Sequence, residues 1–282
     1  MLFKNFFSLC CLLLFAQVNA QTISVMSYNI RLNVASDGVN AWDNRKQQVT
    51  QLINFFEPDI LGCQEVKYEQ LLYLKDSLIH NNYVGVARDD GKTEGEFSPI
   101  FFNSQKFTKL KEGTFWLSTT PTQVSRGWDA ACNRVCTYVL LQDKLTKRKF
   151  WAANTHLDHE GVVARKQSVA LIHQQLQKLS NNFNIPVIIT GDFNEQPHEP
   201  ALQFMLQNYR NTRAASATAP MGNADTWNGF AFNSESKGCI DYIFLSPNSP
   251  WQVSKFATIT QSYQLKYPSD HFPIFSIIKW KN

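Results

Sequence analysis

Short apolar runs alternate along the chain with segments in which apolar residues recur at helical spacing. The apolar runs predict strands near residues 23–31, 59–63, 83–87, 98–102, 107–117, 134–141, 148–154, 186–190, 239–245, 253–259 and 272–278. The helical spacing predicts helices from residue 43 to Pro58, near residues 70–78, over residues 163–179 and near residues 199–206. This order indicates an α/β fold in one domain, because no Pro/Gly/Ser-rich linker or block of charge divides the chain.

The run over residues 186–190 (PVIIT) is apolar on both faces, which predicts a buried strand in a sheet covered on both sides. It stops at Gly191, which we expect to make the turn that carries Asp192 and Asn194 to the edge of the sheet. Alternation along the backbone turns Phe193 inward. A carboxylate and an amide on a rigid strand end can hold a water molecule and a charged oxygen, although an Asp/Asn turn is the simpler alternative.

Three other segments end an apolar run with a polar residue of the type that binds ligands. They are residues 27–31 (SYNIR), residues 64–65 (QE) and residues 269–273 (SDHFP). Together with GDFN at residues 191–194, and in this order, they resemble the endonuclease/exonuclease/phosphatase superfamily of DNase I-like phosphoesterases. The resemblance extends from about Ile23 to the C-terminus. It implies a two-sheet β-sandwich flanked by helices, in four layers, with the active site at one rim.

The resemblance also implies roles for the residues at the strand ends. Glu65 would be the main metal ligand, with Asn29 and Asp270 near the ion. The implied ion is Mg²⁺, which prefers one or two carboxylates and keeps several waters, with Mn²⁺ or Ca²⁺ as alternatives. Asp192 would orient or deprotonate the attacking water, and Asn194 would donate to the charge that develops on the phosphoryl group.

Two histidines complete the implied catalytic set. Asp241 would pair with His271, fixing its tautomer and favouring its charged form beside the phosphate. His156 would be the second, with Glu96 as its carboxylate partner. Two imidazole donors and a cation around one phosphorus atom suit the stabilisation of a pentacovalent dianion.

Two further residues are candidates for supporting the phosphate. Arg134 begins a predicted strand aimed at the same edge and can hold a phosphate oxygen, or can be an ordinary surface arginine. His159 follows the strand that carries His156, where Asp158 and Glu160 can instead cap the next helix. Four tryptophans, Trp42, Trp116, Trp128 and Trp227, can line a substrate groove, although burial in the core is the simpler expectation for each of them.

The first 20 residues differ from the rest of the chain. Lys4 precedes an apolar run through Phe15, and small residues end this region at Ala20. This pattern predicts a signal peptide cleaved after Ala20 and a mature domain over residues 21–282. We therefore expect a protein exported to the periplasm or the extracellular space, without a membrane-spanning helix.

Charge and cysteine content limit the possible partners. Loss of residues 1–20 removes one base, Lys4, so the formal net charge falls from +4 to +3, which is too mild to indicate nucleic-acid binding. Cys132 and Cys136 can form a disulfide if the chain loops between them, but lie too far apart in an extended strand. Cys63 and Cys239 lie in apolar runs and are expected to be buried thiols.

These observations predict an exported, monomeric, Mg²⁺-dependent hydrolase of a phosphodiester or phosphomonoester. One alternative is a nuclease acting on DNA or RNA, which the mixed or neutral loops disfavour. Another is a sphingomyelinase-like lipid phosphodiesterase that uses the aromatic segment at residues 227–232. The third is a non-catalytic binding protein on the same scaffold, which the presence of every core site residue disfavours.

Overall fold

The computed structural model describes residues 22–281, and the predicted signal peptide lies outside this range. The first half contains β1 (Thr22–Asn29), η1 (Ala35–Asn40), α1 (Trp42–Phe56), β2 (Ile60–Gln64), α2 (Tyr68–Ser77), β3 (Asn81–Val84), β4 (Ile100–Asn103) and β5 (Phe107–Trp116). The second half contains β6 (Val135–Asp143), β7 (Lys149–His156), α3 (Val162–Leu179), β8 (Val187–Asp192), α4 (Pro200–Asn208), β9 (Arg210–Asn211), β10 (Asp241–Leu245), β11 (Trp251–Thr258) and β12 (Ile274–Trp280).

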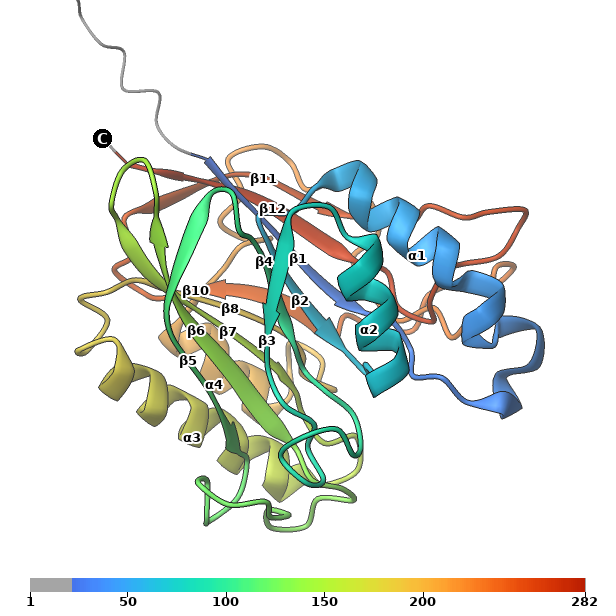
Figure 1. Ribbon diagram of the computed structural model, residues 1–282, viewed down its shortest axis with the longest axis horizontal. Coiled ribbons are helices and arrows are strands. Elements are labelled where there is room, and N and C mark those ends of the chain that lie inside the picture. Colours follow the sequence, from blue (N-terminus) through green and yellow to red (C-terminus); the bar gives the residue numbers. More distant parts are fainter. Residues whose placement is uncertain (1–21, 282) are drawn as a thin grey trace, which may run out of the picture.

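Two six-stranded sheets pack against each other, with helices on their outer faces (Figure 1). The strand order is β11-β12-β1-β2-β4-β3 in one sheet and β5-β6-β7-β8-β10-β9 in the other. Helices α1 and α2 cover the first sheet, and α3 and α4 cover the second (Figure 1). The predicted four-layer sandwich is therefore confirmed.

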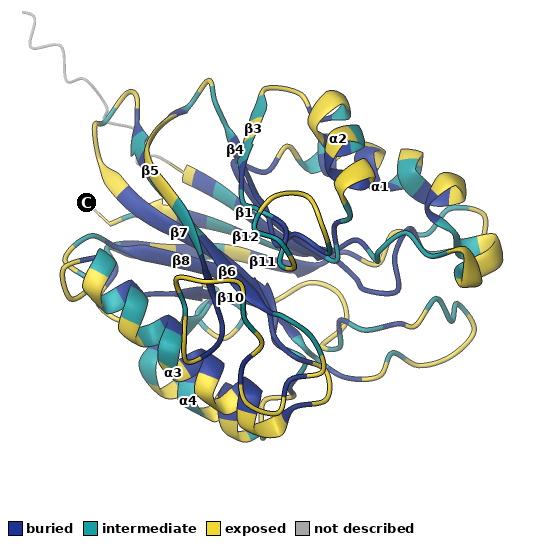
Figure 2. Cartoon of the chain, turned by 60° about the horizontal axis from the view of Figure 1, so that its bottom comes forward, coloured by how far each residue is buried: buried dark blue, intermediate teal, exposed yellow. Residues whose placement is uncertain are grey.

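Three buried clusters hold these layers together. The cluster between the sheets joins residues such as Val25 and Phe102 of the first sheet to Ile188 and Ile243 of the second. A second cluster packs α3 and α4 on one sheet, and a third packs α1 and α2 on the other. Figure 2 shows buried strands in the interior and helices exposed only along their outer sides. Burial on both faces explains why the central strands are apolar at nearly every position.

A small layer of buried polar side chains connects the two sheets. It lies near the rim at which the candidate site residues are found. Asn154 Nδ2 donates to the carbonyl oxygens of Cys63 and Pro99, and Asn154 Oδ1 accepts from Gln64 Nε2 at 2.7 Å. Thr190 Oγ1 also contacts Asn154 Oδ1, at 3.0 Å. Because each of these buried groups has a partner in the opposite sheet or strand, the network sets how the two sheets meet.

Two departures from the predicted strands have clear causes. Strand β3 ends at Val84 rather than near Ala87, because Gly85 takes a φ of 126° that only glycine adopts readily. Gly191 lies inside β8 and makes no turn, which corrects the expected role of this residue. A Cβ at Gly191 would lie 2.7 Å from the carbonyl oxygen of Thr155, so the close approach of β7 requires glycine there.

The cysteines and helices of residues 22–281 give two further results. Within this range all four cysteines are free thiols, and Cys136 lies on β6 while Cys132 lies in the preceding loop. Cys63 is buried as predicted, whereas Cys239 is only partly buried. No helix in this range is long and apolar enough to cross a membrane.

Candidate active site

Neighbouring strands of both sheets bring their polar ends to one rim. In the second sheet His156 pairs with Asp192, and Asp192 pairs with Asp241, so three site residues form a row across β7, β8 and β10. In the first sheet Asn29 ends β1, and Glu65 directly follows β2. These ends surround a cavity of about 440 Å³.

The loop before β12 contributes the last part of the rim. Ser269 Oγ donates to the carbonyl oxygen of Asn29 at 2.7 Å, which places Asp270 and His271 against the end of β1. The cavity is lined by most of the predicted site residues, which are Glu65, Glu96, Arg134, His156, His159, Asp192, Asn194, Asp270 and His271. Asn29 and Asp241 lie directly behind them, within hydrogen-bond distance of Asp192 or His271.

Three residues at this rim have a strained backbone conformation. Arg31, Glu65 and Asn194 follow β1, β2 and β8, and their φ angles are 58°, 59° and 48°, in the left-handed region. This conformation is uncommon for residues other than glycine and costs about 1 kcal/mol or more where the side chain is bulky. The sharp turns that follow aim the side chains of Glu65 and Asn194 across the cavity, where both line its wall.

The carboxylate of Glu65 is held by neutral donors. Glu65 Oε1 accepts from Asn29 Nδ2 at 3.0 Å, and Oε2 accepts from the backbone N–H of Leu32 at 3.1 Å. Arg31 approaches both Glu65 and Asp270 only to 3.9 Å, because its guanidinium already makes two hydrogen bonds to Asp37. Within residues 22–281 no lysine or arginine donates a hydrogen bond to Glu65, Asp192 or Asp270.

This set of donors fits a divalent cation. Burial raises the pKa of Asp270, and the nearby carboxylate of Glu65 adds to this effect. Ligand atoms of Glu65, His156 and Asp192 lie within 4.8 Å of one another. A hard divalent cation would offset the repulsion among these acidic oxygens, which are the ligands it prefers.

Asp192 occupies the centre of the site and is 1% exposed. Its Oδ2 accepts from Asn29 Nδ2 at 2.9 Å, and its Oδ1 accepts from the backbone N–H of Asn194 at 2.9 Å. Burial, together with the adjacent carboxylate of Asp241, raises the pKa of Asp192 to about 7. A carboxyl group with that pKa is suited to accept a proton from water near neutral pH.

His271 lies between two carboxylates. Its Nδ1 is 2.9 Å from Asp241 Oδ2, and its Nε2 is 3.8 Å from Asp192 Oδ2. Burial alone lowers the pKa of His271, but the charges of Asp241 and Asp192 outweigh burial and hold this pKa well above its usual value. Its two carboxylate neighbours therefore favour the protonated imidazole of His271 on the cavity wall.

His156 has a different environment. Its Nε2 lies 3.0 Å from Asn194 Nδ2 and 3.5 Å from Asp192 Oδ2. Burial lowers the pKa of His156 well below its usual value, and the charges of Arg134 and Arg88 lower it further. The two histidines thus differ in charge.

The resemblance implies that Glu96 pairs with His156, but the two side chains form no hydrogen bond. Glu96 Oε2 is 3.9 Å from His156 Nδ1, and this nitrogen is buried without a hydrogen-bond partner. The Glu96 carboxylate instead binds the guanidinium of Arg88, with two contacts of 2.9 Å. Arg88 directs Glu96 away because a bidentate arginine pair is stronger than a single bond to imidazole.

Arg134 and His159 lie at one corner of the cavity. Arg134 Nε donates to Asp158 Oδ2 at 3.3 Å, and Arg134 Nη2 lies 2.9 Å from His159 Nδ1. Asp158 also accepts backbone hydrogen bonds from Glu160 and Gly161, which precede α3, so it does not cap the helix itself. The first N–H groups of α3 are capped from elsewhere in the chain, by Asp129.

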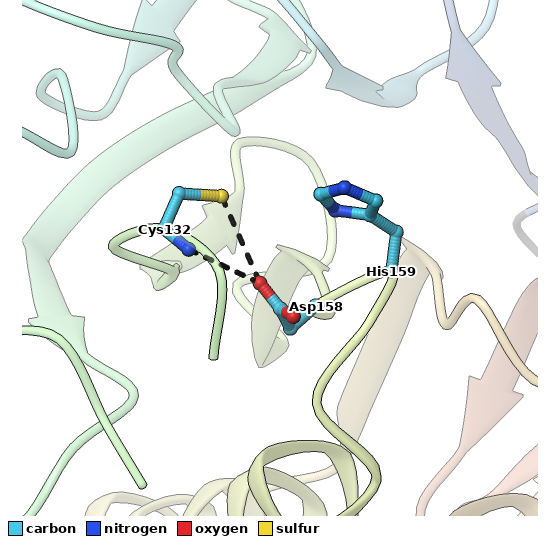
Figure 3. Close-up of side chains that lie close together, drawn as sticks. All are labelled: Cys132, Asp158 and His159. Atoms are coloured by element: carbon cyan, nitrogen blue, oxygen red, sulfur yellow. Dashed lines mark hydrogen bonds between the residues drawn. The ribbon is translucent and has the colours of Figure 1, made fainter. Parts of the chain in front are cut away.

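Figure 3 shows Cys132 and His159 on either side of Asp158, with dashed lines from the carboxylate to Cys132. Ligand atoms of these three residues lie within 4.8 Å of one another. However, Asp158 already accepts bonds from backbone N–H groups and Arg134, so its oxygens have no free position for a cation. The corner is therefore organised around a guanidinium.

Five residues that line the cavity were not predicted from sequence as site residues. They are Arg31, Leu32, Arg88, Cys132 and Ile240. Arg31 lies within the SYNIR motif, where its position next to Asn29 was a usable signal. Among the tryptophans, Trp227 lines the cavity, Trp42 and Trp116 are buried, and Trp128 is exposed.

Comparison with known proteins identifies the family. The model of the endonuclease/exonuclease/phosphatase family matches residues 26–271, which include every site residue described above. The chain belongs to this family. Members of this family are hydrolases that act on phosphoester bonds, so the coarse chemistry of the rim follows from membership.

Two solved structures from Bacteroides thetaiotaomicron are similar over nearly their whole length. One is an endonuclease/exonuclease/phosphatase family protein, with 32% identity, a TM-score of 0.88 and coverage of 93% of this chain and 96% of that one. The other is a mannosyl-6-phosphatase, with 34% identity, a TM-score of 0.86 and coverage of 92% of this chain and 100% of that one.

A curated relative is more distant. The CCR4-Not complex 3'-5'-exoribonuclease subunit Ccr4 of Mycosarcoma maydis is 24% identical over 90% of this chain. This chain spans only 49% of the length of that relative.

Proposed function

We propose that this family member is a divalent-cation-dependent phosphatase that hydrolyses the phosphomonoester of a small polar molecule by direct attack of water. The observation that carries the proposal is the convergence of Glu65, Asp192 and Asp270 on one cavity with a cationic His271. Acidic oxygens suit a cation and an attacking water, while the histidine suits a phosphate.

The chain's own residues account for the remaining steps. Asp192 is positioned to take a proton from the attacking water, since its raised pKa makes it a base near neutral pH. Asn29 holds the carboxylates of Glu65 and Asp192 in one orientation through its amide. His271, aligned by Asp241, places positive charge where the phosphoryl oxygens gain negative charge.

Glu65 would hold the cation, with Asn29 and Asp270 beside it. The bound ion would neutralise the phosphate and polarise its bond to the leaving oxygen. Mg²⁺ suits these oxygen ligands, and Mn²⁺ shares this preference.

The shape of the site favours a small substrate over a polymer or a membrane lipid. A nearly complete structural match at 34% identity is a mannosyl-6-phosphatase, and Trp227 offers an aromatic wall on which a sugar ring can pack. The two phenylalanines of the segment that a lipid phosphodiesterase would insert are half-buried against the protein. Phe230 packs on Arg45, and Phe232 packs on Tyr267. The +4 charge gives no dense basic surface for a polynucleotide.

Export belongs to the same proposal. The apolar N-terminal region with its small residues before Gln21 supports a signal peptide, and an exported phosphatase would release phosphate from molecules outside the cytoplasm. Detection of a mature N-terminus at Gln21 in the secreted fraction would test this proposal. A protein retaining Met1 in the cytoplasm would contradict it.

The decisive experiment measures phosphate release from mannose 6-phosphate and p-nitrophenyl phosphate, with Mg²⁺ and with a chelator. We expect turnover that depends on the cation and falls at least about 100-fold in Asp192→Ala. Asp76→Ala is the matched control, because Asp76 is an exposed carboxylate on α2. Cation-independent turnover, or full activity in Asp192→Ala, would contradict the proposal. Turnover of bis-p-nitrophenyl phosphate or RNA alone would replace it with the nuclease alternative.

A further inference from the structure

The corner formed by Arg134 and His159 has donor groups that the proposed mechanism does not use. Arg134 is 5% exposed and lines the cavity, and its Nη1 is buried without a hydrogen-bond partner. A guanidinium cannot lose its proton, so a buried N–H without an acceptor costs free energy in the empty protein. An oxygen of a bound ligand near this guanidinium would offset that cost.

Arg134 also determines the orientation of its neighbour. Because arginine only donates, the 2.9 Å contact from Arg134 Nη2 makes Nδ1 of His159 an acceptor. The ring proton of His159 therefore lies on Nε2. This N–H is on the accessible side of the ring, since the His159 side chain is 53% exposed, and its contact with Glu160 Oε1 is long, at 3.5 Å.

The guanidinium of Arg134 is held by Asp158, whose carboxylate is itself held in place by backbone N–H groups. Asp158 accepts from the backbone N–H groups of Ala131, Glu160 and Gly161 as well as from Arg134. Although burial opposes ionisation, these hydrogen bonds and the charge of Arg134 hold the pKa of Asp158 below its usual range. Asp158 is thus an ionised anchor, and Arg134 has a defined orientation at the cavity.

The other two arginines at the cavity are held by carboxylates, although Nε of Arg88 is also buried without a hydrogen-bond partner. Arg31 is bound by Asp37, and Arg88 is bound by Glu96. Arg134 lines the same cavity as His156, and its charge contributes to lowering the pKa of that imidazole.

We propose that Arg134 and His159 together recognise the additional anionic oxygen that distinguishes a phosphomonoester from a phosphodiester. This inference rests on the proposed function and names what selects its substrate class. A diester carries a second organic group where the monoester carries a charged oxygen, so the same corner that binds the oxygen gains little from a diester. Recognition of the charged oxygen uses the charge of Arg134 and the Nε2–H of His159.

The test compares p-nitrophenyl phosphate with methyl p-nitrophenyl phosphate, because these esters share a leaving group and differ in one anionic oxygen. In Arg134→Gln and in His159→Ala we expect kcat/KM for the monoester to fall roughly 10- to 100-fold, while kcat/KM for the methyl diester changes less than about threefold. The double variant should be no worse than Arg134→Gln, since the two residues act as one unit.

Two variants serve as matched controls. Arg148→Gln removes an exposed guanidinium stacked on Trp280, at the far end of β7, and His198→Ala removes an exposed imidazole. Neither should change the ratio of the two kcat/KM values. Arg134→Lys, which keeps the charge but loses the planar fork, should restore part of the monoester preference. Thermal unfolding of each variant confirms that the fold is retained.

Equal losses on both esters, or an unchanged ratio in both single variants, would overturn the inference. If the wild-type protein hydrolyses neither ester, the proposed function fails, and calorimetric titration with inorganic phosphate then decides the role of the corner. Phosphate binding that is lost in Arg134→Gln and retained in Arg148→Gln would support recognition by Arg134. Absence of phosphate binding to the wild type, or equal binding to Arg134→Gln, would overturn it.

Discussion

Nδ1 of His271 lies 2.9 Å from Oδ2 of Asp241, although 30 residues separate them in the chain. Asp241 begins β10 of the second sheet, and His271 lies in the loop before β12 of the first sheet. The contact therefore joins the two sheets at the rim. The carboxylate orients the imidazole and favours its charged form. The charge of His271 at the cavity therefore depends on Asp241, which does not itself line the cavity.

We expect Asp241→Asn to move the alkaline limb of the pH profile for ester hydrolysis to lower pH. Loss of the Asp241 charge lowers the pKa of His271, so the histidine loses its proton earlier as pH rises. The maximal kcat should also fall by about 100-fold, the usual size for a misaligned acid–base group. Steady-state rates between pH 5 and pH 10 provide the measurement, with Asp76→Asn as the control.

The same pair should affect stability with a defined sign. Because the folded pKa of His271 is raised, its contribution is complete below the unfolded pKa of about 6.5 and is lost as pH rises through the folded pKa. The unfolding free energy of the wild type should therefore exceed that of Asp241→Asn by more at pH 6 than at pH 10. A gap that widens with pH would show that His271 is not the cation in this pair.

Mg²⁺ should raise the melting temperature of the wild type but not of Glu65→Gln. A ligand at about 100 times its Kd stabilises the folded state by about 2.7 kcal/mol, which corresponds to roughly 5–10 °C for a domain of this size. Glu65→Gln keeps the shape and the bond to Leu32 but loses the charge that a hard cation needs. Glu57→Gln, an exposed carboxylate after α1, is the control. An equal Mg²⁺ shift in Glu65→Gln would exclude Glu65 as a ligand.

Asn154→Leu should destabilise the fold by about 2–4 kcal/mol, because it removes the buried side-chain donor to the Cys63 and Pro99 carbonyl oxygens and the shortest hydrogen bond of Gln64 Nε2. Urea unfolding followed by circular dichroism measures this loss. Asn233→Ala, in an exposed loop, should change stability by less than about 0.5 kcal/mol. A comparable, small effect in both variants would mean that the polar layer does not hold the sheets together.

Cys132 should be the most reactive thiol of residues 22–281 in the folded protein. Burial raises the pKa of Cys132 as well as those of Cys63 and Cys136, but Cys132 is partly exposed at the cavity, whereas Cys63 and Cys136 are buried away from solvent. Burial also raises the pKa of Cys239 to about 11, so its thiolate is scarce near pH 8. Iodoacetamide labelling at pH 8, mapped by mass spectrometry, should modify Cys132 first, and saturating phosphate should slow this reaction. Labelling of Cys63 or Cys136 at the same rate would contradict the burial described here.

The element types and the catalytic rim are largely local information. A run such as residues 186–190 has no polar face to expose, so it must be a central strand, and the GDFN motif then necessarily lies at its end. The SYNIR, QE and SDHFP segments carry the same signal. The resemblance of these ordered motifs to the family then implied the two-sheet fold and a set of polar residues at one rim.

The partners of those residues were not predictable in the same way. Arg88 takes the carboxylate of Glu96 from His156, and Asp158 fixes Arg134 beside His159, because these contacts depend on how loops from separate strands meet. Gly191 is needed for the approach of β7 rather than for a turn, which no local pattern reveals. The sequence by itself determined which strands end in polar residues, since burial of a strand is a property of its own side chains. Only the tertiary structure decided which charges pair and which donors face the cavity, because electrostatic interactions depend on distances between segments that are far apart in the chain.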